Sequence, residues 1–568
     1  MSRKRGLLFL QLPALDNDVR GPRENLPLAG VCLKRALERS PAGRLFAPDF
    51  LPPEADDWDN ATLAREICAR RPAVLACTLY LWNIERTLRL LRRLRRERPE
   101  LAVVVGGPEA AWSHPLLFRA GVAEAVAVGE GENVFPEILA ALAAGRRTDF
   151  ATVAWRQGRR YVWGRRTPPP VDLARQAPPA DDAWLRPDGH GTAALETVRG
   201  CPLRCSFCRY PQLRRRLTWL PPAEVARRVA VLAERGAREI KFTDPTFNAH
   251  PQFAETLELL AAVNRERRVA FFAELRADTL RPEDAEWLAR ANFTEIEVGL
   301  QSSDPAVLEA IRRPGTPPRV REGVRRLTAQ GIRVTLDVMY GLPRQTADDV
   351  YRSLEWGLGR RHVRVQGLQT LLLPGTALRR EARRWRMEAA RLPPYGVYAT
   401  ATLSRDDLRR IEEWIAATPG LPADSPAERY LGRRLPDLFA EQVAIPLTPA
   451  APPVIGGRHN RRALVFAGPR LYERREGILA AIRAAVRREP DALWQFVLEP
   501  DEPEPLDLLD ALHAELQRQL RRLLDRYAGT FLTGRLASRR VFVRLQRGRR
   551  YDRAWTAAVE AELRRRYY

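Results

Sequence analysis

Short apolar runs alternate with amphipathic helical patterns along the first 144 residues of the chain. The runs typical of strands are residues 7–12, 45–50, 73–80, 102–107 and 122–131. Helical spacing covers residues 26–39, 62–70, 83–97 and 132–144. Strands and helices in this order predict a doubly wound parallel sheet in an N-terminal domain of residues 1–150.

Ligands bind such sheets beyond the carboxyl ends of the strands, which lie here at residues 78–82, 106–109 and 129–132. A glycine at such an end lets the backbone approach a ligand closely. The candidate ligand contacts are therefore Gly106, Gly107, Gly129 and Glu130. The alternative is that these glycines merely end their strands.

A second series of strand and helix patterns covers residues 192–395. Its strands lie in ALETVRG, EIKFTDPTF, VAFFAELRAD, EIEVGLQSSD, RVTLDVMYGLP and VQGLQTLLLPGT. Repeated units of this length predict a full or partial β/α barrel with its site at the carboxyl ends of the strands. Residues 151–191 are rich in Pro and Arg, include a possible hairpin, and are interpreted as a linker.

After residue 395 the strand signal fades. The remaining residues, 396–568, are mostly helical in pattern and rich in Arg, with two Pro-rich interruptions. We therefore expect an α/β chain that ends in a mainly helical C-terminal domain of unknown role.

The net charge of +24 raises the question of a nucleic-acid partner. Lysine occurs only at positions 4, 34 and 241, and the many Arg residues fall mostly on the polar faces of helical patterns. Solvated helix faces explain this charge better than nucleic-acid binding. Because no apolar run reaches about 18 residues and the N-terminus lacks a signal-peptide pattern, we expect a cytoplasmic protein without a membrane span.

The segment RGCPLRCSFCRY places Cys201, Cys205 and Cys208 directly after a predicted strand. Thiolates are the ligands of iron–sulfur clusters, and three thiolates leave one iron of a four-iron cluster open for a substrate. The alternatives are a zinc site, for which His190 is a conceivable fourth ligand, and three buried structural cysteines.

This spacing resembles the defining motif of the radical S-adenosylmethionine (radical SAM) superfamily, and the resemblance covers about residues 192–378. It implies a [4Fe-4S] cluster on the three cysteines and a 5′-deoxyadenosyl radical made from S-adenosylmethionine. Phe207 matches the aromatic residue before the last cysteine, which touches the adenine in relatives. Later motifs that resemble those of the family imply cofactor contacts at Asp244, Glu274, Arg276, Gly299, Gln301, Ser302 and Gly341, with Leu342 and Pro343 beside the last.

The N-terminal segments VVGGPE and GEGE resemble the cobalamin-binding domain of one branch of that superfamily. The domain lacks the motif Asp-x-His-x-x-Gly, and its only histidine, His114, follows the expected pocket. The resemblance therefore implies cobalamin without a histidine ligand, or a domain that has lost this cofactor. Cys32, Cys68 and Cys77 raise the alternative of a second cluster, as in RNA methylthiotransferases.

The resemblance implies an enzyme, with cobalamin-dependent methyl transfer to an unactivated carbon or phosphorus as the favoured reaction. Ring formation, rearrangement and methylthiotransfer use the same parts and remain alternatives, as does a non-catalytic nucleic-acid-binding protein with a structural cluster. The expected partners are a small-molecule or peptide substrate and an electron donor such as flavodoxin or ferredoxin.

Overall fold

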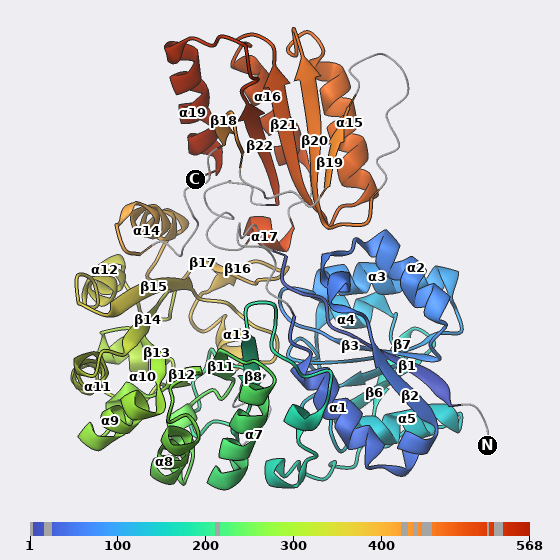
Figure 1. The fold of residues 1–568 in the computed structure, drawn as a ribbon, viewed down its shortest axis with the longest axis vertical. Coiled ribbons are helices and arrows are strands. Elements are labelled where there is room, and N and C mark those ends of the chain that lie inside the picture. The colour runs from blue at the N-terminus through green and yellow to red at the C-terminus, as the bar shows by residue number, and fades with distance from the viewer. Residues whose placement is uncertain are drawn as a thin grey trace. The chain divides into compact units, whose positions relative to one another are not determined.

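The computed structural model describes residues 4–15, 25–210, 216–421, 430–435, 441–445, 457–519, 522–526 and 538–567. The chain forms two compact units (Figure 1). Of the described residues, the first unit takes 4–12, 25–51 and those between 71 and 421, and the second takes 13–15, 52–70 and those from 430 onward. The expected N-terminal domain and the expected barrel thus lie together in the first unit.

The first sheet has seven strands in the order β2-β1-β3-β4-β5-β6-β7. Five are parallel: β1 (Arg5–Leu10), β2 (Phe46–Phe50), β3 (Val74–Thr78), β4 (Ala102–Gly106) and β5 (Ala125–Ala127). The expected hairpin, β6 (Val153–Gln157) and β7 (Arg160–Trp163), extends this sheet antiparallel to β5. Because the strand order reverses between β1 and β3, the carboxyl ends there form the crevice in which such sheets bind ligands.

Helices cover both faces of this sheet (Figure 1). On one face, α1 (Leu28–Glu38) and α5 (Phe135–Ala143) pack on a core that includes Phe9 and Phe50. On the other face, α3 (Ile84–Glu97) contacts α4 (Pro115–Ala120). The sequence of α3 explains its orientation, because its leucines are buried and its arginines, apart from the buried Arg86, recur on the opposite side.

The second sheet has six parallel strands in the order β15-β14-β13-β12-β11-β8. Along the chain they are β8 (Thr192–Leu195), β11 (Glu239–Phe242), β12 (Ala270–Leu275), β13 (Phe293–Gln301), β14 (Arg333–Tyr340) and β15 (Val363–Gln369). The helices that connect them are α7 (Pro222–Glu234), α8 (Phe253–Val263), α9 (Pro282–Ala291), α10 (Pro305–Ala310), α11 (Pro317–Ala329) and α12 (Ala347–Glu355). The α/β class and the partial barrel expected from the sequence are confirmed.

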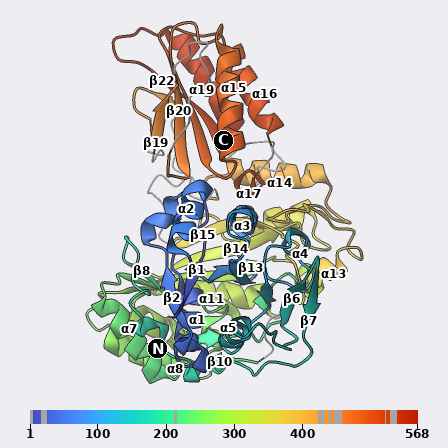
Figure 2. The same ribbon diagram turned by 90° about the vertical axis from the view of Figure 1, so that its right-hand side faces the viewer.

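The C-terminal region requires a correction. It contains the expected helices, but they pack on a parallel sheet in the order β18-β22-β21-β20-β19, so the region is α/β and not mainly helical. The strands are β18 (Leu431–Gly432), β19 (Glu441–Ala444), β20 (Arg461–Gly468), β21 (Leu493–Pro500) and β22 (Arg539–Arg544). Figure 2 shows α15 (Arg475–Arg488) and α16 (Asp507–Arg518) on one side of this sheet.

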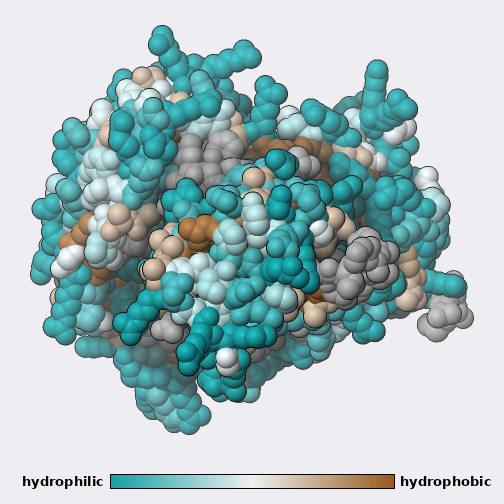
Figure 3. All heavy atoms as spheres, turned by 90° about the horizontal axis from the view of Figure 1, so that it is seen from above, coloured by the Kyte–Doolittle hydropathy of each residue, from teal (hydrophilic) through white to brown (hydrophobic). Residues whose placement is uncertain are grey.

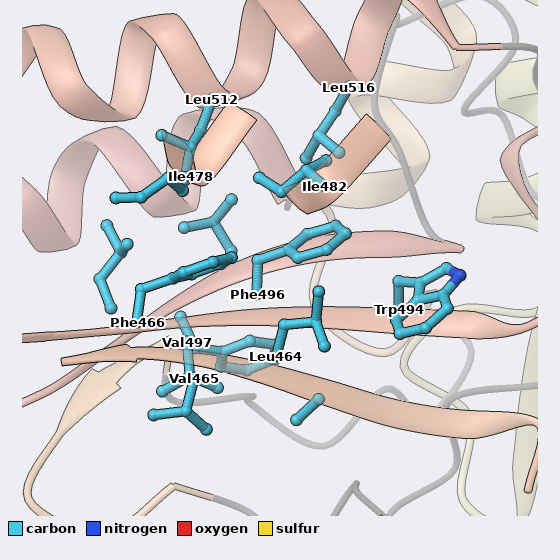
Figure 4. Packing of buried hydrophobic residues seen from close by; sticks show 14 of the residues in the cluster. Leu464, Val465, Phe466, Ile478, Ile482, Trp494, Phe496, Val497, Leu512 and Leu516 are labelled. Atoms are coloured by element: carbon cyan, nitrogen blue, oxygen red, sulfur yellow. The ribbon is translucent and has the colours of Figure 1, made fainter. Parts of the chain in front are cut away.

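The sequence hides this sheet because its central strands are buried on both faces and therefore show no alternation of apolar and polar residues. Figure 4 shows the result: Phe466 and Phe496 from neighbouring strands point toward Ile478 and Ile482 of α15. Short continuous apolar runs of this kind cannot be told from buried helix by periodicity.

The face of the molecule in Figure 3 is largely hydrophilic, with small hydrophobic groups between charged side chains. Many arginines are paired within their own helices, as Arg93 is with Glu97 at 2.8 Å. Within the described residues, no helix combines the length and apolar character needed to cross a membrane.

Candidate active site

The three cysteines lie on a loop that starts at the carboxyl end of β8. Two short strands, β9 (Val198–Arg199) and β10 (Thr218–Trp219), lie at the two ends of this loop and pair with each other. Asp244, from the end of β11, holds the start of the loop by accepting hydrogen bonds from Thr197 N (2.7 Å), Thr197 Oγ1 (2.5 Å) and Val198 N (2.8 Å).

Asp244 was expected to contact the cofactor directly, and the geometry does not support that role. Its carboxylate is fully buried, engaged by the three donors of the loop, and does not line the cavity beside the cysteines. Burial raises its pKa to about 7, although the three hydrogen bonds oppose this shift. We interpret Asp244 as a positioning residue for the cysteine loop.

Cys201, Cys205 and Cys208 line one cavity of about 190 Å³, here called the cysteine cavity. All three are free thiols. In the described part of the chain, no three His, Cys, Asp or Glu side chains converge as they would on a single metal ion. His190, the conceivable fourth ligand of a zinc site, is exposed in a turn before β8 and does not line the cavity. Three separate thiols on one cavity fit a cluster, whose irons each take one thiolate.

The protein environment alone does not favour thiolates in this cavity. Burial raises the pKa of the Cys205 thiol and raises that of Cys208 to about 12. The Arg313 guanidinium, 3.9 Å from Cys205 Sγ, opposes the shift at Cys205. Cys201 Sγ lies 3.5 Å from Thr246 Oγ1. Iron, which binds deprotonated thiols, would therefore supply most of the free energy of deprotonation.

Most residues expected at S-adenosylmethionine line the cysteine cavity; these are Phe207, Glu274, Arg276, Gly299 and Gln301. Ser302 and Gly341 do not line it. Ser302 is fully buried and accepts a hydrogen bond from Asp304 N at 3.1 Å, which places it in the turn before α10.

Two further expected residues build the wall behind Phe207. Leu342 belongs to a buried hydrophobic cluster of α10 and β14 against which the Phe207 ring packs. Gly341, just before it, has a φ of +83° and lies against Val397 and Leu408, so its role in the structure is to turn the chain.

Sequence reasoning missed the acidic residues of this cavity. Glu297 of β13 and Asp337 of β14 line it beside Glu274. Burial and the neighbouring Glu297 raise the pKa of Glu274 to about 7, and the same two causes raise that of Asp337 to about 8. The sequence did carry a signal for Glu297. It lies two positions before Gly299, and this spacing puts both residues on one face of the strand.

A second cavity, of about 440 Å³, opens at the switch point of the first sheet and is here called the glycine cavity. All four expected contacts, Gly106, Gly107, Gly129 and Glu130, line it. Gly107 has a φ of +98°, and a Cβ at this position would lie only 2.7 Å from Leu79 O, so no side chain fits there. Such a wall of bare backbone fits a large, flat ligand such as the corrin ring of cobalamin.

The N-terminal cysteines do not form a second cluster site on one cavity. Cys32 and Cys77 line the glycine cavity, whereas Cys68 belongs to the second compact unit. Burial raises the pKa of both the Cys32 and the Cys77 thiol. These two cysteines therefore act as small hydrophobic side chains.

His114 is fully buried and does not line the glycine cavity. Its Nε2 lies 2.9 Å from Glu109 Oε2 and 2.9 Å from the Tyr395 hydroxyl, which itself donates to Glu109 at 2.8 Å. Histidine ligation of a cobalt ion remains unsupported. The three side chains instead join the loop after β4 to the segment that follows the second sheet.

Arg209 and Tyr210, the two residues that follow Cys208, connect the two cavities. The buried Arg209 guanidinium donates to the carbonyls of Pro108 (3.1 Å) and Ala110 (3.0 Å), next to the glycine cavity, and to Pro374 O (2.7 Å). Tyr210 lines both cavities. The cysteine loop is therefore bound directly to the loop that follows β4.

Comparison with known proteins agrees with this arrangement. Residues 195–357 match the family model of the Radical SAM superfamily, and residues 43–139 match that of the B12 binding domain. The cobalamin-dependent radical SAM methyltransferase TokK of Streptomyces tokunonensis is 26% identical over 386 residues, which cover 63% of this chain and 55% of that protein. The chain spans about half the length of the curated relatives it matches.

Two solved structures share the fold. TsrM from Kitasatospora setae, a radical S-adenosylmethionine methyltransferase with cobalamin and a [4Fe-4S] cluster bound, has a TM-score of 0.55 at 21% identity and covers 68% of this chain and 76% of its own. OxsB, with aqua-cobalamin and S-adenosylmethionine bound, has a TM-score of 0.57 at 14% identity and covers 73% and 67%.

A radical SAM domain implies a [4Fe-4S] cluster and S-adenosylmethionine, and a B12 binding domain implies cobalamin, so the cofactors expected from the sequence are confirmed. The residues that line the cysteine cavity fall within the first of these matched segments, and most of those that line the glycine cavity fall within the second. The chain therefore combines a radical SAM segment with a B12 binding segment.

Proposed function

We propose that this chain is a cobalamin-dependent radical SAM methyltransferase. The observation that carries the proposal is that Tyr210 lines both the cysteine cavity and the glycine cavity, so the two cavities are neighbours across one residue. Methyl transfer of this type requires such neighbours, because one substrate must be reached from both sides.

When bound, the reduced cluster and S-adenosylmethionine supply a 5′-deoxyadenosyl radical, and cobalamin supplies the methyl group. The chain's own residues position these groups and exclude water. Cys201, Cys205 and Cys208 would hold the cluster, and Phe207 closes the cysteine cavity on its apolar side. Gly106 and Gly129 leave room for the corrin, and Arg209 fixes the loop that follows Gly106.

The test is an anaerobic assay of the protein reconstituted with iron, sulfide and cobalamin and reduced in the presence of S-adenosylmethionine. We expect 5′-deoxyadenosine together with S-adenosylhomocysteine, because only methyl transfer consumes the cofactor in two ways. Cys201→Ala should abolish 5′-deoxyadenosine, whereas Cys68→Ala, which removes a cysteine outside both cavities, should not. The product 5′-deoxyadenosine without S-adenosylhomocysteine would favour ring formation or rearrangement instead.

The finer expectations from the sequence form part of the proposal. They are a small-molecule or peptide substrate, flavodoxin or ferredoxin as the electron donor, and a cytoplasmic location. The contacts of Glu274, Arg276, Gly299 and Gln301 with S-adenosylmethionine are likewise proposed, supported by their position on the cysteine cavity.

A further inference from the structure

Two segments of the chain are bound to the outer side of the cysteine loop, away from the cofactor-lining residues. Ser206, which lies between Cys205 and Cys208, is fully buried and lines neither cavity. Its N donates to Ile311 O at 2.8 Å, and its O accepts from Leu378 N at 2.8 Å. The segments that contain Ile311 and Leu378 therefore lie directly against the loop that would hold the cluster.

The first of these segments connects the protein surface with a cysteine. Arg312 follows Ile311, its side chain is 51% exposed, and it forms an ion pair with Glu381 of the second segment. The next residue, Arg313, approaches Cys205 Sγ at 3.9 Å. Two consecutive arginines thus lead from solvent to a proposed cluster ligand.

The second segment is strongly basic. Residues 379–391, which begin within α13 (Ala377–Glu381), contain six arginines and two glutamates. Both glutamates pair with arginines from outside the segment, Glu381 with Arg312 and Glu388 with Arg405 at 2.8 Å. Arg383 is exposed, and no ion pair joins it to another described residue. The segment therefore presents positive charge that its own acids do not neutralise.

A tryptophan brings two of the arginines together. The guanidinium of Arg384 lies 4.8 Å from the centroid of the Trp385 ring, and that of Arg344, from the turn after β14, lies 6.0 Å from it. Glu309 is 3.9 Å from Arg344 but 81% exposed, so water screens this pair. The exposed arginines of both segments and of this turn are here called the arginine surface; they are Arg312, Arg344, Arg380, Arg383 and Arg384.

The chemistry of a radical SAM cluster begins with one electron that comes from outside the protein. We propose that the arginine surface docks the protein that delivers it, an acidic one-electron carrier such as reduced flavodoxin. The carrier loses one electron and the cluster gains it, and no bond or proton is transferred. Opposite surface charges speed the encounter and select this partner. The inference rests on the proposed function, because it assigns the electron-donating partner of the same site.

A nucleic acid would be attracted by the same charge. The hydrogen bonds of Ser206 favour the electron carrier, because they place the arginine surface on the loop of the cluster ligands. None of the five arginines lines the cysteine cavity or the glycine cavity, so their substitution leaves the residues proposed to bind cofactors in place.

The first test measures docking without turnover. The reconstituted protein with its oxidised cluster is titrated with oxidised flavodoxin, and calorimetry gives the dissociation constant at several salt concentrations. The double variant Arg383→Glu with Arg384→Glu should bind at least about tenfold more weakly at low salt, and the difference should shrink as salt screens the charges. If this variant does not retain its cluster, Arg344→Glu, on a different segment, decides.

The matched control is Arg146→Glu with Arg147→Glu. These arginines are also consecutive and exposed, but they belong to the turn after α5. The control changes the net charge by the same amount and should bind flavodoxin within about twofold of the unaltered protein. Equal weakening in both double variants would show that only the total charge matters and would overturn the proposal.

The second test measures electron delivery, with the reduced cluster counted by electron paramagnetic resonance in freeze-quenched samples. Reduced flavodoxin should reduce the Arg383→Glu, Arg384→Glu variant at least about tenfold more slowly than the unaltered protein. Reduced methyl viologen, a small cation, should reduce the variant at least as fast. These opposite responses separate a lost docking surface from a damaged cluster, which would slow both reductants. An unchanged rate with flavodoxin would contradict the proposal.

Neither test depends on methyl transfer. Loss of flavodoxin docking in the variant, combined with no S-adenosylhomocysteine from the unaltered protein, would refute the methyltransferase and leave the docking surface standing. Methyl transfer with flavodoxin that is equally fast in the variant would refute the docking surface alone. Binding of single-stranded RNA that is lost in the variant, while flavodoxin binding is unchanged, would assign the surface to a nucleic acid and overturn the proposal.

Discussion

Arg209 offers the sharpest test of how the chain holds its two cavities together. Its guanidinium donates three hydrogen bonds to buried carbonyls, and Arg209→Met would remove all three while keeping the apolar stem. Hydrogen bonds from a charged donor contribute about 1.5–3 kcal/mol each, but burying the guanidinium costs part of this. We expect a net loss of about 3 kcal/mol, concentrated in the loop that Pro108 and Ala110 belong to.

Hydrogen exchange of two backbone amides reports this loop directly. Glu109 N donates to Leu79 O at 3.0 Å and Ala110 N donates to Gly107 O at 3.0 Å, so opening the loop exposes both. A loss of about 3 kcal/mol corresponds to an exchange rate roughly 100-fold faster. Arg204→Met is the matched control, because Arg204 lies on the same cysteine loop but is exposed. If both variants exchange alike, Arg209 does not hold the loop.

Three further predictions concern other parts of the chain. Gly107→Ala, with a φ of +98°, should lower the affinity for cobalamin in equilibrium dialysis by at least about tenfold, whereas Gly145→Ala, also at positive φ but with open space around it, should not. Asp337, whose pKa is raised from 3.8 to about 8, keeps a proton in the folded state that the unfolded chain releases, so the free energy of unfolding falls as pH rises between those values. Asp337→Asn should therefore lose less stability than the unaltered protein between about pH 5 and 8 in urea unfolding, and an equal loss would refute the assignment. Arg462→Met leaves the buried Asp59 without its ion-pair partner and should lower the stability of the second unit by about 3–5 kcal/mol. Adding Asp59→Asn should restore part of this loss. If stability is not restored, the ion pair is not the cause of the loss.

The parts of the site that lie close together along the chain could be predicted from local sequence patterns. The cysteines, Phe207 and the glycines at strand ends are of this kind, because a strand followed by a turn fixes where its carboxyl end lies. The same reasoning failed for β20 and β21, whose burial on both faces removes the alternation that identifies a strand. The division of the chain at residues 150, 191 and 395 stays a prediction.

The pairing of distant residues could not be predicted from the sequence. Glu297 and Asp337 are both visible as polar residues within apolar strands, but their proximity depends on the register of β13 with β14. Glu109 and Tyr395 are 286 residues apart and meet only because the loop after β4 lies against the segment that follows the second sheet. Asp244 shows the converse error, since a residue in a family motif turned out to hold the loop and not to line the cavity.

The segment after Cys208 suggests how one substrate can be placed against two cofactors. Cys208 lines the cysteine cavity, Arg209 fixes the loop at the glycine cavity, and Tyr210 lines both, so the spacing of the cavities is set by consecutive residues of one chain.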